Sequence, residues 1–251
     1  MIDGRFVQEL DQRFARPMVV AVNGRQKLCV PGDDGYEMQL MSEPVQEPAL
    51  LALSTLTGLV DYVELNRDEI DLAKCVLHVE GPRCVSLRGR LTGEWQQRFT
   101  YAVATCEGVL GAAGKFRFDE YGDHESVIVA LQALFADAWD RSEVLGLLGG
   151  IKDGSVRQFD DNGVTQEVTA RAGLTLVSNV SVPSPVVLAP YRTFRELEQP
   201  ASAFVLRLKA GNPLPQVALF EADGGQWKLE AITRIRTWLA EKLGEKIAVI
   251  A

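Results

Sequence analysis

One segment in the last quarter of the chain interleaves aromatic residues with arginines. It reads Pro-Tyr-Arg-Thr-Phe-Arg-Glu over 190–196, and two more basic residues follow in the next apolar run. Arginine forks match phosphate oxygens in two-point contacts, and aromatic rings stack on bases. We therefore predict a cluster that binds an anionic ligand, made of Tyr191, Arg192, Phe194, Arg195, Arg207 and Lys209. The alternative is a two-sided strand whose Tyr191 or Phe194 lies in the core.

A glycine-rich stretch, Gly108 to Lys115, invites comparison with phosphate-binding loops, in which backbone amides and a lysine hold phosphates. Five residues rather than four separate Gly108 from Gly114, and Phe116 stands where a magnesium-binding Ser or Thr belongs. We interpret the stretch as a flexible loop.

Metal chemistry has little support. His78-Val79-Glu80 with Pro82-Arg83-Cys84 resembles part of a zinc deaminase motif, but the second cysteine of that motif is missing. The chain has two histidines, His78 and His124, which is too few for a three-histidine zinc centre. We predict neither a structural metal nor a cofactor.

Four acids precede a predicted helix: Asp119, Glu120, Asp123 and Glu125. They could act as metal ligands or as a catalytic carboxylate pair. Acids are also favoured at a helix start by the helix dipole, and we prefer that reading. Since the chain also lacks a Gly-x-Ser-x-Gly elbow, we predict no catalytic residues and a protein that is not an enzyme; an unrecognised active site stays open.

The overall charge argues against a general nucleic-acid binder. The 251 residues carry a net charge of −8, although residues 151–251, with 12 basic and 11 acidic side chains, are nearly balanced. Nucleic acid is therefore a less favoured partner. No apolar run reaches the length of a signal peptide or a membrane helix, so we expect a cytoplasmic protein that does not bind membranes. Cys29, Cys75, Cys84 and Cys106 lie in apolar runs without a Cys-x-x-Cys pair and are expected to be reduced.

Residues 1–47 are predicted to form an arm apart from the main domain, 48–251. Phe6, Leu10 and Phe14 recur at helical spacing over 2–15. A strand at 19–22, an Asn-Gly turn and a strand at 27–30 predict a hairpin that 31–35 ends. The proline-containing stretch 42–48 predicts a linker.

The main domain mixes two periodicities. A helix is predicted over 54–67, with Ser54 as its cap and Leu56, Leu59, Val60 and Val63 on its buried face. The other elements predicted up to residue 150 are antiparallel strands at 74–80, 84–91 and 95–106, a short strand at 116–121, and a helical pair from 124 to 148.

Residues 151–251 read mainly as a β-meander followed by a helix. The predicted strands are 156–160, 164–171, 174–182, 186–188, 191–198, 204–209, 217–222 and 227–229. A C-terminal helix over 230–243 carries the apolar stripe Ile232, Ile235, Trp238, Leu239 and Leu243. The fold class is therefore α+β, largely antiparallel sheet flanked by helices.

Three stretches of this region carry a family resemblance: Gly-Val-Thr-Gln-Glu-Val-Thr-Ala-Arg-Ala-Gly over 163–173, Pro-Tyr-Arg-Thr-Phe-Arg-Glu-Leu-Glu-Gln-Pro over 190–200, and Leu-Phe-Glu-Ala-Asp-Gly-Gly-Gln-Trp-Lys-Leu over 219–229. With the preceding elements, residues 50–243 resemble uncharacterised proteins of tailed bacteriophages and prophages. More distantly, the chain is similar to the YfdQ-like prophage family of unknown function. The resemblance implies a phage origin and a bacterial host cytoplasm, and it selects no reaction.

Two functions follow as hypotheses. In the first, the protein is a non-enzymatic phage early or accessory protein that self-assembles and binds a host or defence component, either a protein or a nucleotide signal. In the second, it assists phage recombination or replication by contacting single-stranded DNA. A homo-oligomer is expected because the strand at 204–208, flanked by Pro200 and Pro213, reads as an exposed edge.

Overall fold

The computed structural model describes residues 4–5, 17–22, 25–32, 35–40, 48–93, 96–106, 116–151, 156–161, 166–172, 175–209, 211 and 214–251. Contacts divide the chain into two units, one of Met1–Pro48 with Leu91–Gln97 and one of Ala49–Arg90 with Arg98–Ala251. Most of the predicted helix at 2–15, the linker at 42–47 and the stretch Gly108 to Lys115 lie outside the described residues.

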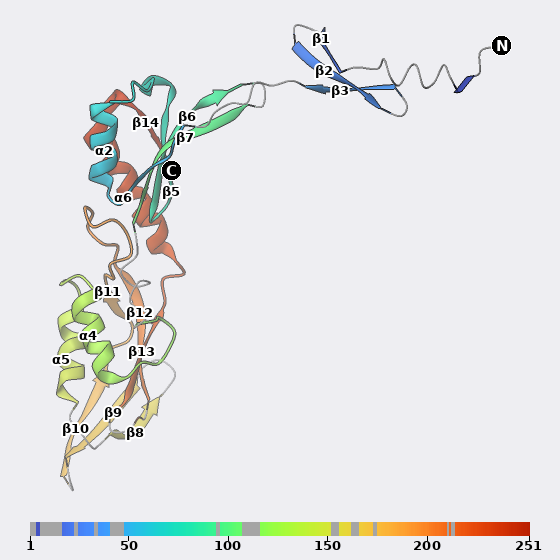
Figure 1. Cartoon of the computed structure of the whole chain (residues 1–251). Helices are drawn as coiled ribbons and strands as arrows, with labels where there is room; N and C mark the ends of the chain where they lie inside the picture. Colours follow the sequence, from blue (N-terminus) through green and yellow to red (C-terminus); the bar gives the residue numbers. More distant parts are fainter. Residues whose placement is uncertain are drawn as a thin grey trace. The chain divides into compact units, whose positions relative to one another are not determined.

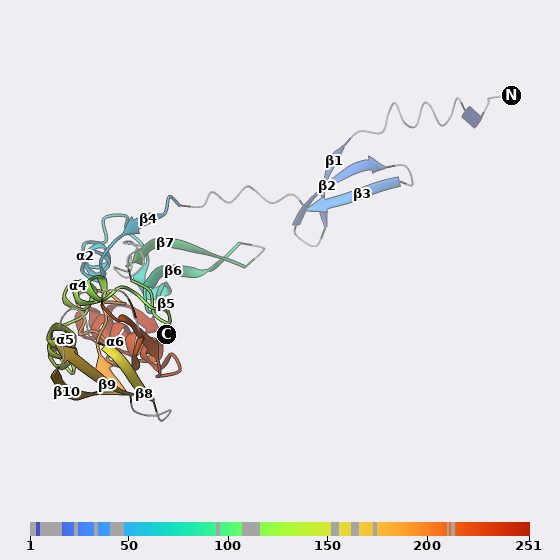
Figure 2. The same cartoon turned by 90° about the horizontal axis from the view of Figure 1, so that it is seen from below.

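The first unit contains a three-stranded antiparallel sheet, β1 (Met18–Val22), β2 (Arg25–Gly32) and β3 (Gly35–Leu40), in the order β1-β2-β3 (Figure 2). Val22 pairs with Arg25, which confirms the predicted hairpin. The pairing of β1 with β2 ends at Cys29, before the predicted stop at 31–35. The third strand was not predicted: β2 continues through Pro31, which pairs with Tyr36 of β3. Proline is tolerated there because β1 reaches only as far as Cys29, so Pro31 has a partner strand on one side only.

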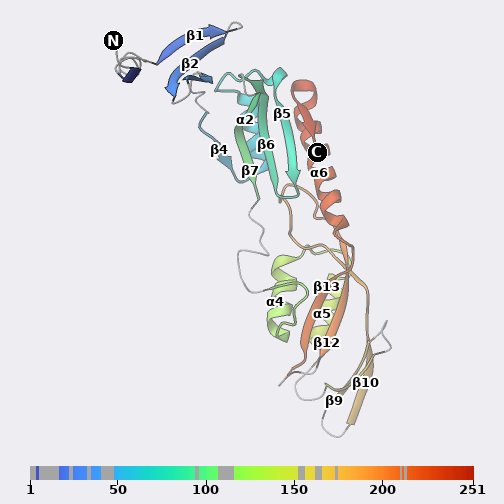
Figure 3. The same ribbon diagram turned by 90° about the vertical axis from the view of Figure 1, so that its right-hand side faces the viewer.

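The second unit begins with a five-stranded sheet of order β14-β5-β6-β7-β4. Strands β5, β6, β7 and β4 can be followed in Figure 3. Its strands are β4 (Leu51–Leu53), β5 (Val76–Gly81), β6 (Cys84–Thr92), β7 (Gln97–Thr105) and β14 (Ala248–Ile250). Its three central strands match the predicted runs. The two edge strands, β4 and β14, pair in parallel with β7 and β5. Short 3₁₀ turns at Leu72–Lys74 and Gly244–Lys246 lead into β5 and β14.

Helices α2 (Leu56–Leu65) and α6 (Gln226–Leu243) share one core with this sheet. The four α2 residues predicted to be buried are all in it, together with Ile235, Leu239 and Leu243 of α6. The predicted strand at 227–229 is wrong, because those residues form the first turn of α6. Gly225 adopts the left-handed conformation immediately before that turn, at φ 82°, which is open to glycine without strain.

The cap of α2 is Thr55 rather than the predicted Ser54. The Thr55 hydroxyl accepts a hydrogen bond from the backbone N–H of Gly58 at 3.0 Å. We expect Thr55→Ala to lower the free energy of unfolding by about 1 kcal/mol, because it leaves an N–H of the first turn without its acceptor. Ser54→Ala, at an exposed neighbouring residue, is the matched control and should change it by less than about 0.5 kcal/mol. Equal losses in urea unfolding would contradict the assignment.

A second core lies between two helices and a three-stranded sheet (Figure 1). The elements are α4 (His124–Leu134), α5 (Arg141–Gly150), β11 (Val186–Leu188), β12 (Ser202–Lys209) and β13 (Gln216–Glu221). The helical pair and the three strands confirm the predictions. The predicted strand at 116–121 is wrong: these residues form turns, with Asp119 in the left-handed conformation at φ 64°.

Strand β12 is the middle strand of this sheet, in the order β11-β12-β13. Phe204 pairs with Val186 on one side and with Glu221 on the other, so the predicted open edge at 204–208 is wrong. The three-residue strand β11, between Pro185 and Pro190, covers the edge that sequence reasoning left open. The edge argument for a homo-oligomer therefore fails, and self-association stays a prediction.

The predicted meander continues in a separate antiparallel sheet of order β10-β9-β8. Its strands are β8 (Val156–Asp161), β9 (Gln166–Ala172) and β10 (Thr175–Val182). The chain is thus α+β and mostly antiparallel, as predicted. None of the helices in the described ranges is long and apolar enough to cross a membrane.

Candidate functional site

The segment that carries most of the predicted cluster is not a strand. Residues 191–198 form bends and turns, so the strand prediction is wrong. The side chain of Gln199 makes the hydrogen bonds to the backbone of this segment that a neighbouring strand would otherwise make. Its Oε1 accepts from the backbone N–H groups of Arg192 and Thr193 at 2.9 and 3.2 Å, and its Nε2 donates to the carbonyl of Phe194 at 3.1 Å.

Arg192 points into the protein and is 2% exposed. Its guanidinium donates to the carboxylate of Glu221 and to the hydroxyl of Ser202, and its central carbon lies 4.1 Å from the centre of the Trp227 ring. Burial lowers the pKa of Arg192 to about 10, although the neighbouring Glu221 and Asp223 carboxylates oppose that shift. The group therefore stays charged at neutral pH as part of a buried ion pair.

Asp223 continues this network to the start of α6. Its carboxylate accepts from the Ser202 hydroxyl at 2.6 Å and from the backbone N–H groups of Gly225 and Trp227 at 2.9 and 3.3 Å. Burial raises the pKa of Asp223, but these hydrogen bonds outweigh it and the net pKa is lowered. The buried network thus fixes where α6 begins.

Phe194 also faces the interior, since it is 1% exposed in the core shared by α2, α6 and the five-stranded sheet. Between it and Arg192, the hydroxyl of Thr193 donates to the carbonyl of Pro82. Arg192 and Phe194 therefore hold the segment in place, as the two-sided alternative anticipated for Phe194.

Arg195 and Tyr191 remain at the surface. The guanidinium carbon of Arg195 lies 4.0 Å from the centre of the Tyr191 ring, a cation–π contact that orients the exposed charge. The adjacent carboxylate of Glu196 is directed elsewhere: it accepts from the backbone N–H of Thr57 at the start of α2, at 3.1 Å. Among the described residues, Arg195 has no ion-pair partner.

Arg83, which sequence reasoning left out of the cluster, lies close to this pair. It is exposed in the turn between β5 and β6, and its Nε donates to the carbonyl of Arg192 at 3.1 Å. Burial raises the pKa of the Cys106 thiol; the Arg83 and Arg195 charges oppose that shift, and the Glu196 carboxylate adds to it. We name the surface of Arg83, Tyr191 and Arg195 the arginine surface. Arg83 and Arg195 are 112 positions apart in the sequence, and no local pattern links them.

Arg207 and Lys209 lie on β12, toward the end of the strand away from Ser202. Arg192 bonds to Ser202 at the start of β12, and Lys209 is seven residues further along that strand, roughly 23 Å away at the rise of a β-strand. The ammonium of Lys209 lies 4.1 Å from the centre of the Tyr121 ring, which in turn meets Phe220 edge-on. The six predicted residues therefore do not line one cleft, and their binding role stays a prediction.

Two of the four acids at the start of α4 accept backbone hydrogen bonds. Asp123 caps α4 by accepting from the N–H of Ser126 at 2.9 Å, which agrees with the helix-start reading of the acids. Asp119 accepts from the N–H of Glu221 at 3.2 Å. Within the described ranges no group of three His, Cys, Asp or Glu side chains could hold a metal ion.

His78 and Glu80, the other half of the incomplete zinc motif, lie on the face of the five-stranded sheet opposite its core. Glu80 accepts from the hydroxyl of Ser86 and from Arg88, the latter at 2.6 Å. Burial raises the pKa of the nearby Cys84 thiol, so the ordinary protonated thiol is favoured there. This cluster is a set of satisfied polar side chains rather than a metal site.

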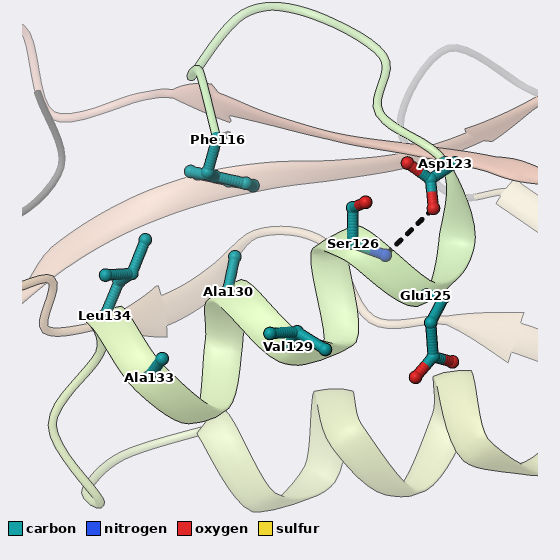
Figure 4. A pocket seen from close by; sticks show the side chains of 8 residues that line it. All are labelled: Phe116, Asp123, Glu125, Ser126, Val129, Ala130, Ala133 and Leu134. Carbon is teal, nitrogen blue, oxygen red and sulfur yellow. Dashed lines mark hydrogen bonds between the residues drawn. The ribbon is translucent and has the colours of Figure 1, made fainter. Parts of the chain in front are cut away.

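One pocket of about 300 Å³ lies along α4 (Figure 4). Phe116 hangs over the helix from the preceding loop, and the pocket is mostly apolar, with Asp123, Glu125 and Ser126 at one end. Its apolar lining consists of Phe116, Val129, Ala130, Ala133 and Leu134.

No family model matches the chain, and no curated protein and no solved structure matches it either.

Proposed function

We propose that this chain is a non-enzymatic bacteriophage accessory protein that binds an anionic ligand at the arginine surface, in the cytoplasm of the host. The ligand class is a nucleotide signal or a phosphate-bearing host component. The supporting observation is a pair of exposed guanidiniums: Arg83 donates to the Arg192 carbonyl, three positions before Arg195, and neither has an ion-pair partner among the described residues.

Two features favour binding over a general surface charge. Arg83 is fixed by its bond to the Arg192 carbonyl, and Arg195 is fixed by Tyr191, so both side chains have lost rotamer freedom before a ligand arrives. The buried network behind them holds the backbone that carries both contacts. Two guanidinium forks on one surface suit the oxygens of a phosphate or diphosphate.

The second candidate is contact with single-stranded DNA. It is favoured by a second cation–aromatic pair, Lys209 with Tyr121, which lies in the same second unit as the arginine surface. A strand of DNA that used both pairs would lose affinity when either is removed, and steeply with salt. A compact nucleotide would depend on the arginine surface alone.

The test measures the melting temperature of the protein with nucleoside phosphates, cyclic dinucleotides and a 15-nucleotide oligothymidylate. Any compound that raises the melting temperature is then titrated to obtain its Kd. We expect Arg195→Ala to weaken binding about 10- to 100-fold, as for a lost charge-assisted hydrogen bond. Arg90→Ala, at an exposed arginine of β6, is the matched control and should leave affinity unchanged.

Lys209→Ala separates the two candidates. Unchanged affinity supports the compact nucleotide, and a loss equal to that of Arg195→Ala, confined to thymidylate, supports single-stranded DNA. A panel without any stabilising compound would contradict both.

A further inference from the structure

Trp139 is an exposed aromatic residue in a strained backbone conformation. It lies in the connection between α4 and α5, is 62% exposed and has φ 57°, in the left-handed region that large side chains seldom adopt. Strain of this kind persists only where the surroundings impose it, and it gathers at functional positions.

The surroundings of Trp139 are rigid. The N–H of Ala136 donates to the carbonyl of Ala189 at 2.9 Å, and the N–H of Asp140 donates to the carbonyl of Val187 at 3.1 Å. The Asp140 carboxylate accepts from the N–H of Val187 at 2.7 Å. The backbone on both sides of Trp139 is thus tied to β11 and to the residue after it. Little backbone entropy is therefore lost when a partner covers the indole.

The pocket on α4 is apolar and has room for such an anchor. Its volume of about 300 Å³ can hold an indole ring, and two alanines keep its floor open (Figure 4). Leu134 belongs to the last turn of α4, and Trp139 follows it by five residues, at most about 18 Å of chain. The Cα atom of Trp139 therefore lies within about 18 Å of Leu134, at one end of the pocket.

We propose that the chain forms a two-fold dimer in which Trp139 of each copy inserts into the α4 pocket of the other. Because each copy supplies one anchor and one pocket, a single two-fold axis makes both contacts at once and closes the assembly. The acids beside Trp139 do not oppose the contact: Asp137 pairs with Arg141 at 2.6 Å, and Asp140 is held by Val187. This inference is independent of the arginine surface.

The first test measures the molar mass by sedimentation velocity from 1 to 200 µM. The wild-type chain should move from 27.6 kDa toward twice that mass. Trp139→Ala should weaken the dimer about 1,000-fold, since two anchors are lost, each worth about 30-fold. Higher salt should strengthen the wild-type dimer because each copy carries a charge of −8.

The second test is complementation. Ala133→Glu blocks the pocket at an exposed helical position, and Gln132→Glu, which adds the same charge one residue away and outside the pocket lining, is its control. Trp139→Ala and Ala133→Glu should each be monomeric at 20 µM, and their mixture should form heterodimers through one remaining contact. A monomeric wild type at 200 µM, a Trp139→Ala dimer of wild-type affinity, or a mixture that stays monomeric would overturn the proposal.

Discussion

Replacing Leu239 by Asp is expected to lower the free energy of unfolding by about 4 kcal/mol or more, and at 37 °C to leave much of the second unit unfolded. Leu239 has no exposed surface and lies in the core between α6, α2 and the five-stranded sheet. An aspartate there must be buried either as an unpaired charge or in its protonated form, and both are costly.

The matched control for this substitution is Ala240→Asp, which adds the same charge to the exposed neighbouring position of α6. It should change the free energy of unfolding by less than about 1 kcal/mol. Urea unfolding followed by tryptophan fluorescence measures both variants. A Leu239→Asp variant as stable as Ala240→Asp would show that α6 does not pack as described.

Replacing Arg192 by Met is expected to cost about 3–5 kcal/mol. The substitution keeps most of the side-chain volume, but it removes the guanidinium that pairs with the Glu221 carboxylate. That carboxylate then lies next to the buried Met side chain without an ion-pair partner. Arg195→Met, three residues on, is the control and should cost less than about 1 kcal/mol because Arg195 is exposed.

A double variant, Arg192→Met with Glu221→Gln, separates the ion pair from packing. It should recover part of the loss, because the amide removes the unpaired charge. Additive losses in the double-mutant cycle would mean that Arg192 acts only by filling space against Trp227.

Periodic elements were predictable from the sequence. The apolar stripes of α2 and α6 have the 3.6-residue period of a helix buried on one face, and each predicted core residue of α2 is buried. The hairpin β1–β2 followed from its Asn-Gly turn and alternating strands. In these cases the local spacing of apolar residues predicts the same secondary structure that burial in the fold favours.

Elements that depend on distant partners were not predictable. The alternation of aromatic residues and arginines at 191–198 is typical of a strand, but the side chain of Gln199 takes up the backbone groups that a strand would pair. The three-residue strand β14 carries no period at all and exists because β5 offers a parallel edge. The sequence of β12 is typical of an edge strand, and the three-residue β11 that pairs with it is too short to indicate its partner.

The candidate site shows the same division. Residue type alone picks out Tyr191 and Arg195, which lie at the surface and whose binding role stays a prediction. The burial of Arg192 depends on Glu221, Ser202 and Trp227 from three later elements. Arg83 joins them only through the fold, since it lies in the turn between β5 and β6. A single sequence contains no local pattern that pairs such residues.

The most direct test of the arginine surface is a native mass measurement of the full-length protein purified from phage-infected bacteria. The wild-type protein is expected to carry an additional small anionic molecule above its chain mass of 27.6 kDa, or above a multiple of it. The double variant Arg83→Ala, Arg195→Ala is expected to lose that molecule while keeping the same number of subunits. A wild-type protein without any retained molecule, or a double variant that retains the same molecule at equal occupancy, would contradict the account.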